Sequence, residues 1–140
     1  MADYTLANAA IQRFLSAKSV AVLATVQPSG APLATPMWFV QDDHSLIMIS
    51  ENHLQKVKNL YRDPRACVAV EGEVDGGIAG VIVQGQIRIL DTETERAPYI
   101  DALHAKYDGA LASRWGGRAM PSDRVMFRLE ANRVNVWGLT

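Results

Sequence analysis

The sequence contains a single cysteine, Cys67, among its 140 residues. One thiol can form neither an internal disulfide nor a CxxC metal site, so a fold stapled by internal disulfides and a cysteine-based zinc site are excluded. Cys67 stands in the apolar run 66–70, where no neighbouring base could make it a thiolate. We therefore expect a buried, inert thiol and not a nucleophile.

Long hydrophobic runs are also missing, because no apolar stretch approaches the roughly 20 residues needed to cross a bilayer. Residues 1–8 lack the basic and then apolar order of a signal peptide. Basic and acidic residues nearly cancel, 14 against 15, which argues against a polybasic arm or an acidic tail. We expect a cytoplasmic protein that binds neither membranes nor nucleic acid.

Several motifs of common enzyme classes are absent. No GxGxxG follows a strand, and no GxxxxGK[ST] or HExxH occurs, so dinucleotide-fold, P-loop and zinc-enzyme hypotheses lose their usual support. His44, His53 and His104 are scattered, and we expect solvated surface roles for them and no metal site. Asp101 and His104 stand three apart on a predicted helix, but no nucleophile completes a triad. We assign no catalytic side chain.

What the chain does contain is a series of short segments rich in β-branched residues and separated by turn residues. Its length suits one domain, residues 1–140. Six strands are predicted, of which the first three should form a meander: 19–26, 32–40, 45–50, 66–70, 81–90 and 124–138. Helices are predicted at 5–18, 54–62, 92–107 and 110–118. We therefore predict a mainly β fold, a six-stranded antiparallel barrel with peripheral helices.

Local features refine this prediction. A glycine-rich link should span residues 72–80, and Gly85 interrupts the fifth strand as a β-bulge would. Pro98 should kink or restart the third helix. The last strand should break near residues 131–132. The second helix should pack through one apolar face, made of Leu54, Val57, Leu60 and Tyr61.

An ordered set of short motifs runs from the first strand to the end of the second helix. In chain order they are VLATV at 22–26, GAP at 30–32, TPMWF at 35–39, IS at 49–50, KVKNL at 56–60 and DPR at 63–65. In this order and spacing the chain resembles the pyridoxamine 5'-phosphate oxidase-like superfamily of FMN-binding split β-barrels, and within it the branch that uses the deazaflavin coenzyme F420. The resemblance covers nearly the whole chain. It implies a homodimer with two cofactor sites at the subunit interface, where the ring lies across the second and third strands.

The resemblance also implies cofactor-binding residues. Lys56 matches the lysine that meets the cofactor phosphate, and Asn59 is a second contact or a residue that fixes the helix. Five residues match positions along the ring and its ribityl chain: Pro36, Met37, Trp38, Ile49 and Ser50. Elementary chemistry agrees, because a flat ring needs an apolar slot, and a phosphate needs basic side chains at a strand-to-helix junction, where Lys56 and Lys58 stand.

The second strand bears on the choice of cofactor. Pyridoxamine phosphate oxidases place an arginine and a lysine on or beside this strand to bind the FMN phosphate, whereas residues 32–40 contain no basic residue. Vitamin B6 oxidation is therefore disfavoured. We favour the deazaflavin over FMN, because its acidic tail needs only a looser basic rim, which Lys56, Lys58, Arg62 and Arg65 supply.

The expected function is hydride transfer from the reduced cofactor to a small, electron-poor organic substrate, such as a conjugated or quinone-like acceptor. Three alternatives stay open: an FMN-dependent flavoprotein of the oxidase type, a non-catalytic carrier of a flavin, deazaflavin or haem, and a dimeric β-protein with a degenerate pocket. Trp137 and residues 114–118 are candidates for contact with the second subunit.

Overall fold

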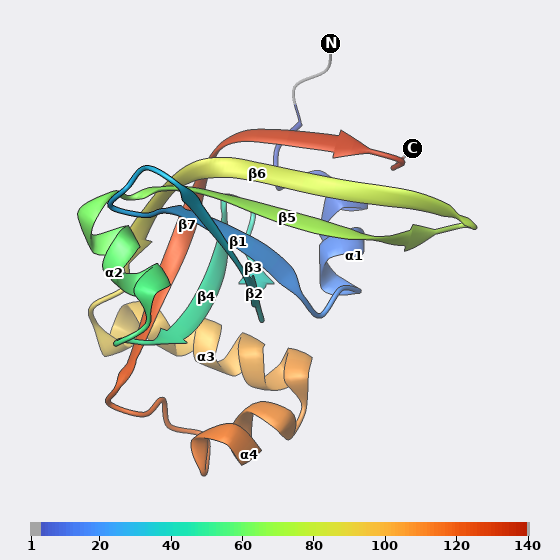
Figure 1. Ribbon diagram of the computed structural model, residues 1–140. Coiled ribbons are helices and arrows are strands. Elements are labelled where there is room, and N and C mark those ends of the chain that lie inside the picture. The colour runs from blue at the N-terminus through green and yellow to red at the C-terminus, as the bar shows by residue number, and fades with distance from the viewer. Residues whose placement is uncertain (1–3, 140) are drawn as a thin grey trace.

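Seven antiparallel strands form one curved sheet in the computed structural model, which describes residues 4–139 (Figure 1). The strand order is β2-β1-β5-β6-β7-β4-β3. The strands are β1 (Ala21–Val26), β2 (Pro32–Met37), β3 (Val40–Gln41), β4 (Ser45–Glu51), β5 (Arg65–Val74), β6 (Gly77–Ile89) and β7 (Arg124–Trp137). The helices are α1 (Ala9–Ser16), α2 (Gln55–Arg62), α3 (Glu93–Tyr107) and α4 (Ala110–Trp115). The predicted mainly β, antiparallel fold with peripheral helices is confirmed.

The predicted second strand, residues 32–40, is two strands, so the sheet has seven strands and not six. β2 ends at Met37, and Trp38 and Phe39 connect it to β3. The backbone N–H of Phe39 donates a hydrogen bond to the Tyr107 hydroxyl at 2.8 Å, which takes this residue out of the sheet ladder. Because β2 and β3 are the two edges of the sheet, this short link requires the sheet to curl until its edges approach each other.

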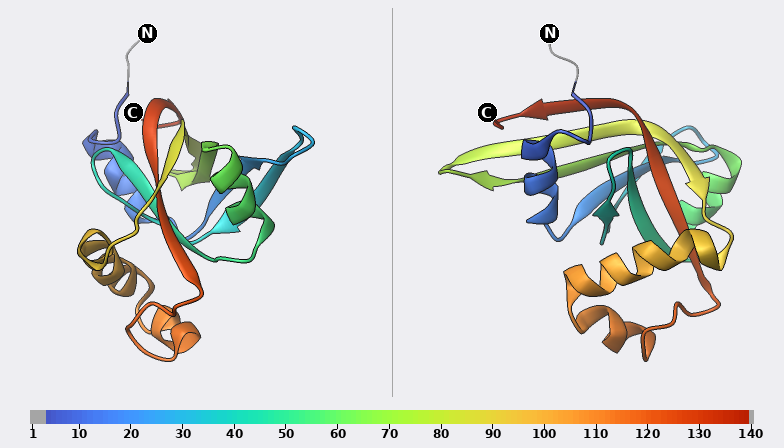
Figure 2. Two further views of the ribbon diagram at one scale, coloured as in Figure 1. Left: turned by 90° about the vertical axis from the view of Figure 1, so that its left-hand side faces the viewer. Right: turned by 180° about the vertical axis from the view of Figure 1, so that it is seen from behind.

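The predicted meander of the first three strands forms only in part, because the predicted second strand divides between the two edges of the sheet. β1 pairs with β2, but β4 pairs with β3 and β7. The first four residues of β4, 45–48, are all buried. They are buried in succession because both faces of β4 are covered: Leu46 and Met48 pack in the barrel interior, whereas Ile47 packs with Leu103 of α3. Figure 2 shows α3 and α4 together at one end of the barrel.

β5 and β6 are longer than predicted and form a hairpin. The glycine-rich segment 72–80, predicted to be a link, is paired backbone for most of its length. Its turn consists of Asp75 and Gly76, whose φ angles are 49° and 78°. Two consecutive residues with positive φ match the twist of the flanking strands, which explains why the hairpin closes here.

The predicted bulge at Gly85 is confirmed, and the extra residue belongs to β7. Gly85 faces Ala131 and Gln84 faces Arg133, which leaves Asn132 without a partner. A Cβ atom at position 85 would overlap the carbonyl oxygen of Glu130, so glycine is required. The predicted break at 131–132 is this bulge, and the strand continues through it to Trp137.

The helices lie close to their predicted positions. α1 begins at Ala9, later than predicted, because the Asn8 side chain accepts hydrogen bonds from two backbone N–H groups of the first turn. α3 begins after Thr92, whose hydroxyl caps it, and continues through Pro98 without restarting. No helix within residues 4–139 is long and apolar enough to span a membrane.

The expected burial of two residues, Cys67 and His104, is corrected, whereas a raised thiol pKa agrees with the inert thiol expected at Cys67. Cys67 is only partly buried, on the outer face of β5, and this partial burial raises the pKa of its thiol. His104 is 5% exposed, and its Nε2 lies 3.0 Å from the carbonyl oxygen of Arg118. It therefore holds the loop after α4 to α3. His44 and His53 are exposed, as expected.

Candidate functional site

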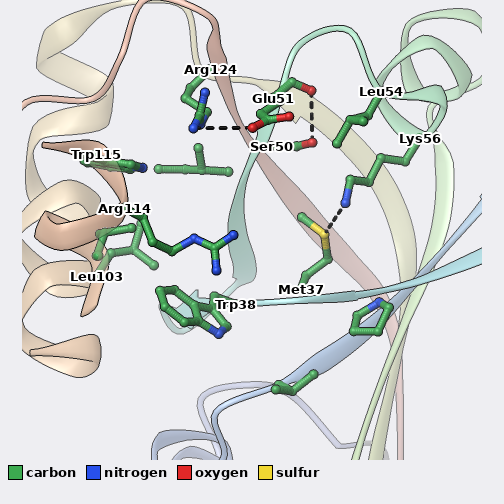
Figure 3. Close-up of a pocket in the computed structure, with 14 residues that line it drawn as sticks. Met37, Trp38, Ser50, Glu51, Leu54, Lys56, Leu103, Arg114, Trp115 and Arg124 are labelled. Atoms are coloured by element: carbon green, nitrogen blue, oxygen red, sulfur yellow. Dashed lines mark hydrogen bonds and ion pairs between the residues drawn. The ribbon is translucent and has the colours of Figure 1, made fainter. Parts of the chain in front are cut away.

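A pocket of about 370 Å³ opens where β2 and β4 end, between α2 on one side and α3 and α4 on the other (Figure 3). Its lining comes from regions of the chain that the sheet topology brings together. The lining residues are Val20, Pro36, Met37, Trp38, Ile49, Ser50, Glu51, Leu54, Lys56, Leu103, Leu111, Arg114, Trp115 and Arg124.

The aromatic wall of the pocket is Trp38, in the link between β2 and β3. Its ring stacks on Tyr107 of α3, with ring centroids 4.4 Å apart and an interplanar angle of 7°. The Tyr107 hydroxyl accepts the Phe39 N–H and donates to the carbonyl oxygen of Ser19, at 2.8 Å in each case. The indole therefore has a rigid support, and such a flat apolar wall suits an aromatic ligand.

Lys56, in the first turn of α2, gives one end of the pocket a positive charge. Its ammonium lies 3.1 Å from the sulfur of Met37, and no carboxylate of residues 4–139 lies within ion-pair distance of it. Burial lowers the pKa of Lys56, and the charge of Glu51 partly opposes this effect. A half-buried ammonium without an anionic partner is a favourable place for a phosphate.

The other two cations of the pocket differ from each other. Arg124 forms ion pairs with Asp123 and, at 3.5 Å, with Glu51, so its charge is compensated. Arg114 of α4 lies over the Trp38 ring, with its Cζ 5.5 Å from the ring centroid. Figure 3 shows Arg114 beside Trp38 on one side of the pocket and Lys56 beside Met37 on the other.

Six of the eight residues predicted to bind a cofactor line this pocket: Pro36, Met37, Trp38, Ile49, Ser50 and Lys56. The other two do not. Lys58 is exposed on another face of α2, and Asn59 is fully buried beneath that helix. The predicted apolar face of α2 is also corrected, because Tyr61 is 66% exposed and Asn59 takes an inward position.

Asn59 fixes α2 to the sheet. Its Nδ2 donates to the Thr25 hydroxyl of β1 at 3.0 Å, and its Oδ1 accepts from Gln55 at 2.8 Å. We expect Asn59→Ala to lower the free energy of unfolding by about 1–3 kcal/mol, because it leaves a buried hydroxyl without its partner. Denaturant unfolding measures this, with Lys58→Ala as a matched control that changes stability by less than about 0.5 kcal/mol. An unaltered stability for Asn59→Ala would contradict this structural role.

Sequence reasoning missed the residues that α3, α4 and β7 bring to the pocket. Arg114 was predicted only as part of a segment that contacts a second subunit, and Arg124 was not singled out. Arg124 reaches the pocket because it lies opposite Glu51 in the β4–β7 ladder. No local signal marks such a pairing, since the two residues are more than 70 positions apart in the chain.

Comparison with known proteins agrees with this architecture. The chain is similar to the crystal structure of a conserved hypothetical protein from Mycobacterium tuberculosis, with 27% identity, a TM-score of 0.80, and coverage of 98% of this chain and 88% of that one. It is also similar to an F420 reductase, with 25% identity, a TM-score of 0.67, and coverage of 89% and 94%. The haem storage protein of Vibrio cholerae shares the fold at 17% identity, with a TM-score of 0.76 and coverage of 92% and 93%. No curated protein sequence matches the chain significantly.

A match to a family model shows which protein family the chain belongs to. The model described as pyridoxamine 5'-phosphate oxidase matches residues 7–138, nearly the whole chain. Together with the curled antiparallel sheet, this match confirms the predicted split-barrel fold. The chain belongs to the pyridoxamine 5'-phosphate oxidase family.

Proposed function

We propose that two copies of this chain form an oxidoreductase that binds the deazaflavin coenzyme F420 in the pocket between β2, β4 and α2. The proposed reaction is hydride transfer to a small, electron-poor organic molecule. The observation that carries the proposal is Lys56, whose ammonium stands half-buried at one end of a pocket with an apolar wall and has no carboxylate partner within residues 4–139.

The residues of the pocket fit the chemical parts of such a cofactor. Lys56 would meet the phosphate, and α2 begins without a side-chain cap, which leaves backbone N–H groups of its first turn available as donors. Met37, Trp38 and Ile49 would face the flat ring. The bound cofactor supplies the hydride chemistry, so the protein has to bind it, orient it and exclude water.

Two observations favour the deazaflavin over FMN. β2 carries no basic side chain, so the phosphate contacts on this side of the site are few. The similarity to an F420 reductase, at 25% identity over 89% of this chain, supports the same choice. FMN is the alternative cofactor, and measured affinities for the two cofactors distinguish between them.

The outer face of the sheet supports the proposed homodimer. Residues opposite each other in neighbouring strands point to the same side, and around Val22 and Ala24 of β1 these are small and apolar. The set is Val22, Ala24, Ala34, Pro36, Cys67 and Ala69, which we call the outer patch. Pro36 belongs both to this patch and to the lining of the pocket. A second subunit on the outer patch would therefore also border the cofactor.

A carrier without catalytic activity is the rival function, because the haem storage protein of Vibrio cholerae has the same fold. Haem iron is held by histidine, cysteine or tyrosine, and in cytochromes c by methionine together with histidine. None of the described residues that line the pocket is histidine, cysteine or tyrosine, and the sulfur of Met37, the methionine of the lining, contacts the Lys56 ammonium. The lining therefore favours a flavin or deazaflavin over haem.

Parallel titrations of the purified protein with the deazaflavin and with FMN test the proposed function. We expect tighter binding of the deazaflavin, with one molecule bound per chain, and reduction of menadione when the reduced deazaflavin is supplied. Tight binding of FMN and not of the deazaflavin would show that FMN is the cofactor. Binding without turnover of any quinone would support the carrier, and binding of neither cofactor would contradict both.

A further inference from the structure

We infer that Arg114 selects the substrate, and that the substrate is a small apolar molecule with one carboxylate group. This inference rests on the proposed function, because it places the substrate in the same pocket, at the end opposite Lys56. Arg114 would bind the carboxylate directly, and the apolar residues beside it would contact the body of the molecule.

Arg114, an exposed residue of α4, lies over the ring of Trp38. Tyr107 stacks on Trp38 with ring centroids 4.4 Å apart, and the guanidinium Cζ of Arg114 lies 5.5 Å from the Trp38 ring centroid. A planar guanidinium over an aromatic ring can still donate hydrogen bonds from the N–H groups at the edge of its plane. No acid within residues 4–139 forms an ion pair with Arg114, which lines the pocket. Its donors therefore remain available to a ligand.

The charges of the pocket indicate a single negative charge on this ligand. Arg124 is already compensated by Glu51 and Asp123. Lys56 lies beside Met37 on the other side of the pocket (Figure 3) and is assigned to the cofactor phosphate. One guanidinium remains, and its planar pair of N–H donors matches one carboxylate in bidentate geometry. A phosphate dianion would require a second cation at this end.

The surroundings of Arg114 are apolar. Leu103 and Leu111 are 2% and 6% exposed, and both line the pocket beside it. Trp115, the next residue of α4, packs edge-on against the buried His104 ring, with centroids 5.3 Å apart and planes at 89°. This contact holds the indole at the pocket wall. A hydrophobic body attached to the carboxylate is the chemistry that these walls recognise.

Calorimetric titration with matched aromatic probes tests the inference in the full-length chain carrying Lys56→Ala, so that the ammonium of Lys56 does not bind the probes. The probes are 2-naphthoate, its uncharged methyl ester and 2-naphthyl phosphate. We expect this Lys56→Ala background to bind 2-naphthoate about tenfold more tightly than the ester, the scale of one charge-assisted contact. Arg114→Gln should abolish this preference, and Arg114→Lys should retain only part of it, because lysine lacks the bidentate geometry. Arg118→Gln, which removes an exposed arginine outside the pocket, is the matched control and should keep the preference.

The outcomes separate this inference from the proposed function. The probes need no cofactor, so the preference for a carboxylate can be measured even if the deazaflavin does not bind. Equal binding of acid and ester, or a preference that survives Arg114→Gln, would overturn the inference. Tighter binding of naphthyl phosphate than of naphthoate would also overturn it. The affinity of Arg114→Gln for the deazaflavin gives a further check. If Arg114→Gln lost as much affinity for the deazaflavin as for naphthoate, Arg114 would be assigned to the cofactor and the inference would be overturned.

Discussion

Replacement of Lys56 by alanine should weaken deazaflavin binding at least about tenfold, because it removes a charge-assisted contact to the cofactor phosphate. Lys56 is the residue of α2 whose ammonium reaches the pocket, where it lies 3.1 Å from the sulfur of Met37. Fluorescence titration of the cofactor measures the effect. The protein should stay folded, since Lys56 forms no ion pair with another described residue.

Lys58→Ala provides the matched control for this experiment. It removes the same charge from the same helix, at an exposed position outside the pocket. A loss of affinity in Lys56→Ala that Lys58→Ala does not reproduce supports a direct contact. Equal losses in both variants would indicate only long-range attraction and would contradict the assignment of Lys56.

The pH dependence of binding gives a second measure of the Lys56 contact. Burial lowers the pKa of Lys56 below its ordinary value of 10.5, so the free protein loses this charge at a lower pH than an exposed lysine would. The contact is present while Lys56 is protonated and is lost as the pH rises through its pKa. Wild-type affinity for the deazaflavin should therefore fall on the alkaline side. In Lys56→Ala this decline should be absent.

A single charge on the outer patch should separate the proposed dimer into monomers and reduce cofactor binding. Ala24 stands at the centre of the patch, opposite Ala34 on one side and Cys67 on the other. Ala24→Glu would bury a carboxylate without a partner between the subunits, which we expect to raise the dimer dissociation constant by about a hundredfold or more. Sedimentation velocity at several protein concentrations measures the association.

Ala97→Glu on α3 is the matched control, because it makes the same substitution at an exposed helical position away from the outer patch. It should leave both association and cofactor affinity unchanged. If Ala24→Glu remained a dimer with wild-type affinity, the subunits would not meet on the outer patch. If it became a monomer and still bound the cofactor fully, the second subunit would not border the site.

The strands were predictable because their signals are local. Runs of β-branched residues and the turns between them give six of the seven strands, and the glycine at 85 indicates the bulge. The division of β2 from β3 was not predictable. It depends on the bond from the Phe39 N–H to Tyr107, a residue 68 positions later in the chain. The pairing of β4 with β7 is equally remote, so the local order of the strands indicates the pairings of β1 with β2 and of β3 with β4 but not that of β4 with β7.

The candidate site was likewise predictable only where its residues lie close together in the sequence. The part of the pocket that comes from residues 36–56 was anticipated, because those residues lie in the stretch where the motifs are densest. Asn59 was assigned two possible roles, and its bond to Thr25 explains its burial as a structural one. Arg114 and Trp115 could not be placed, because only the packing of α4 against α3 brings them opposite Lys56. The positive charge of Arg114 in the pocket therefore could not be predicted from the sequence and is found only in the structure.

The most direct test of the account is a crystal structure of the protein grown with the deazaflavin. The account predicts the flat ring beside Met37 and Trp38, the phosphate within hydrogen-bond distance of the Lys56 ammonium, and a second copy of the chain on the outer patch beside the ring. A monomer, or a dimer whose subunits meet elsewhere and leave the cofactor outside this pocket, would contradict it.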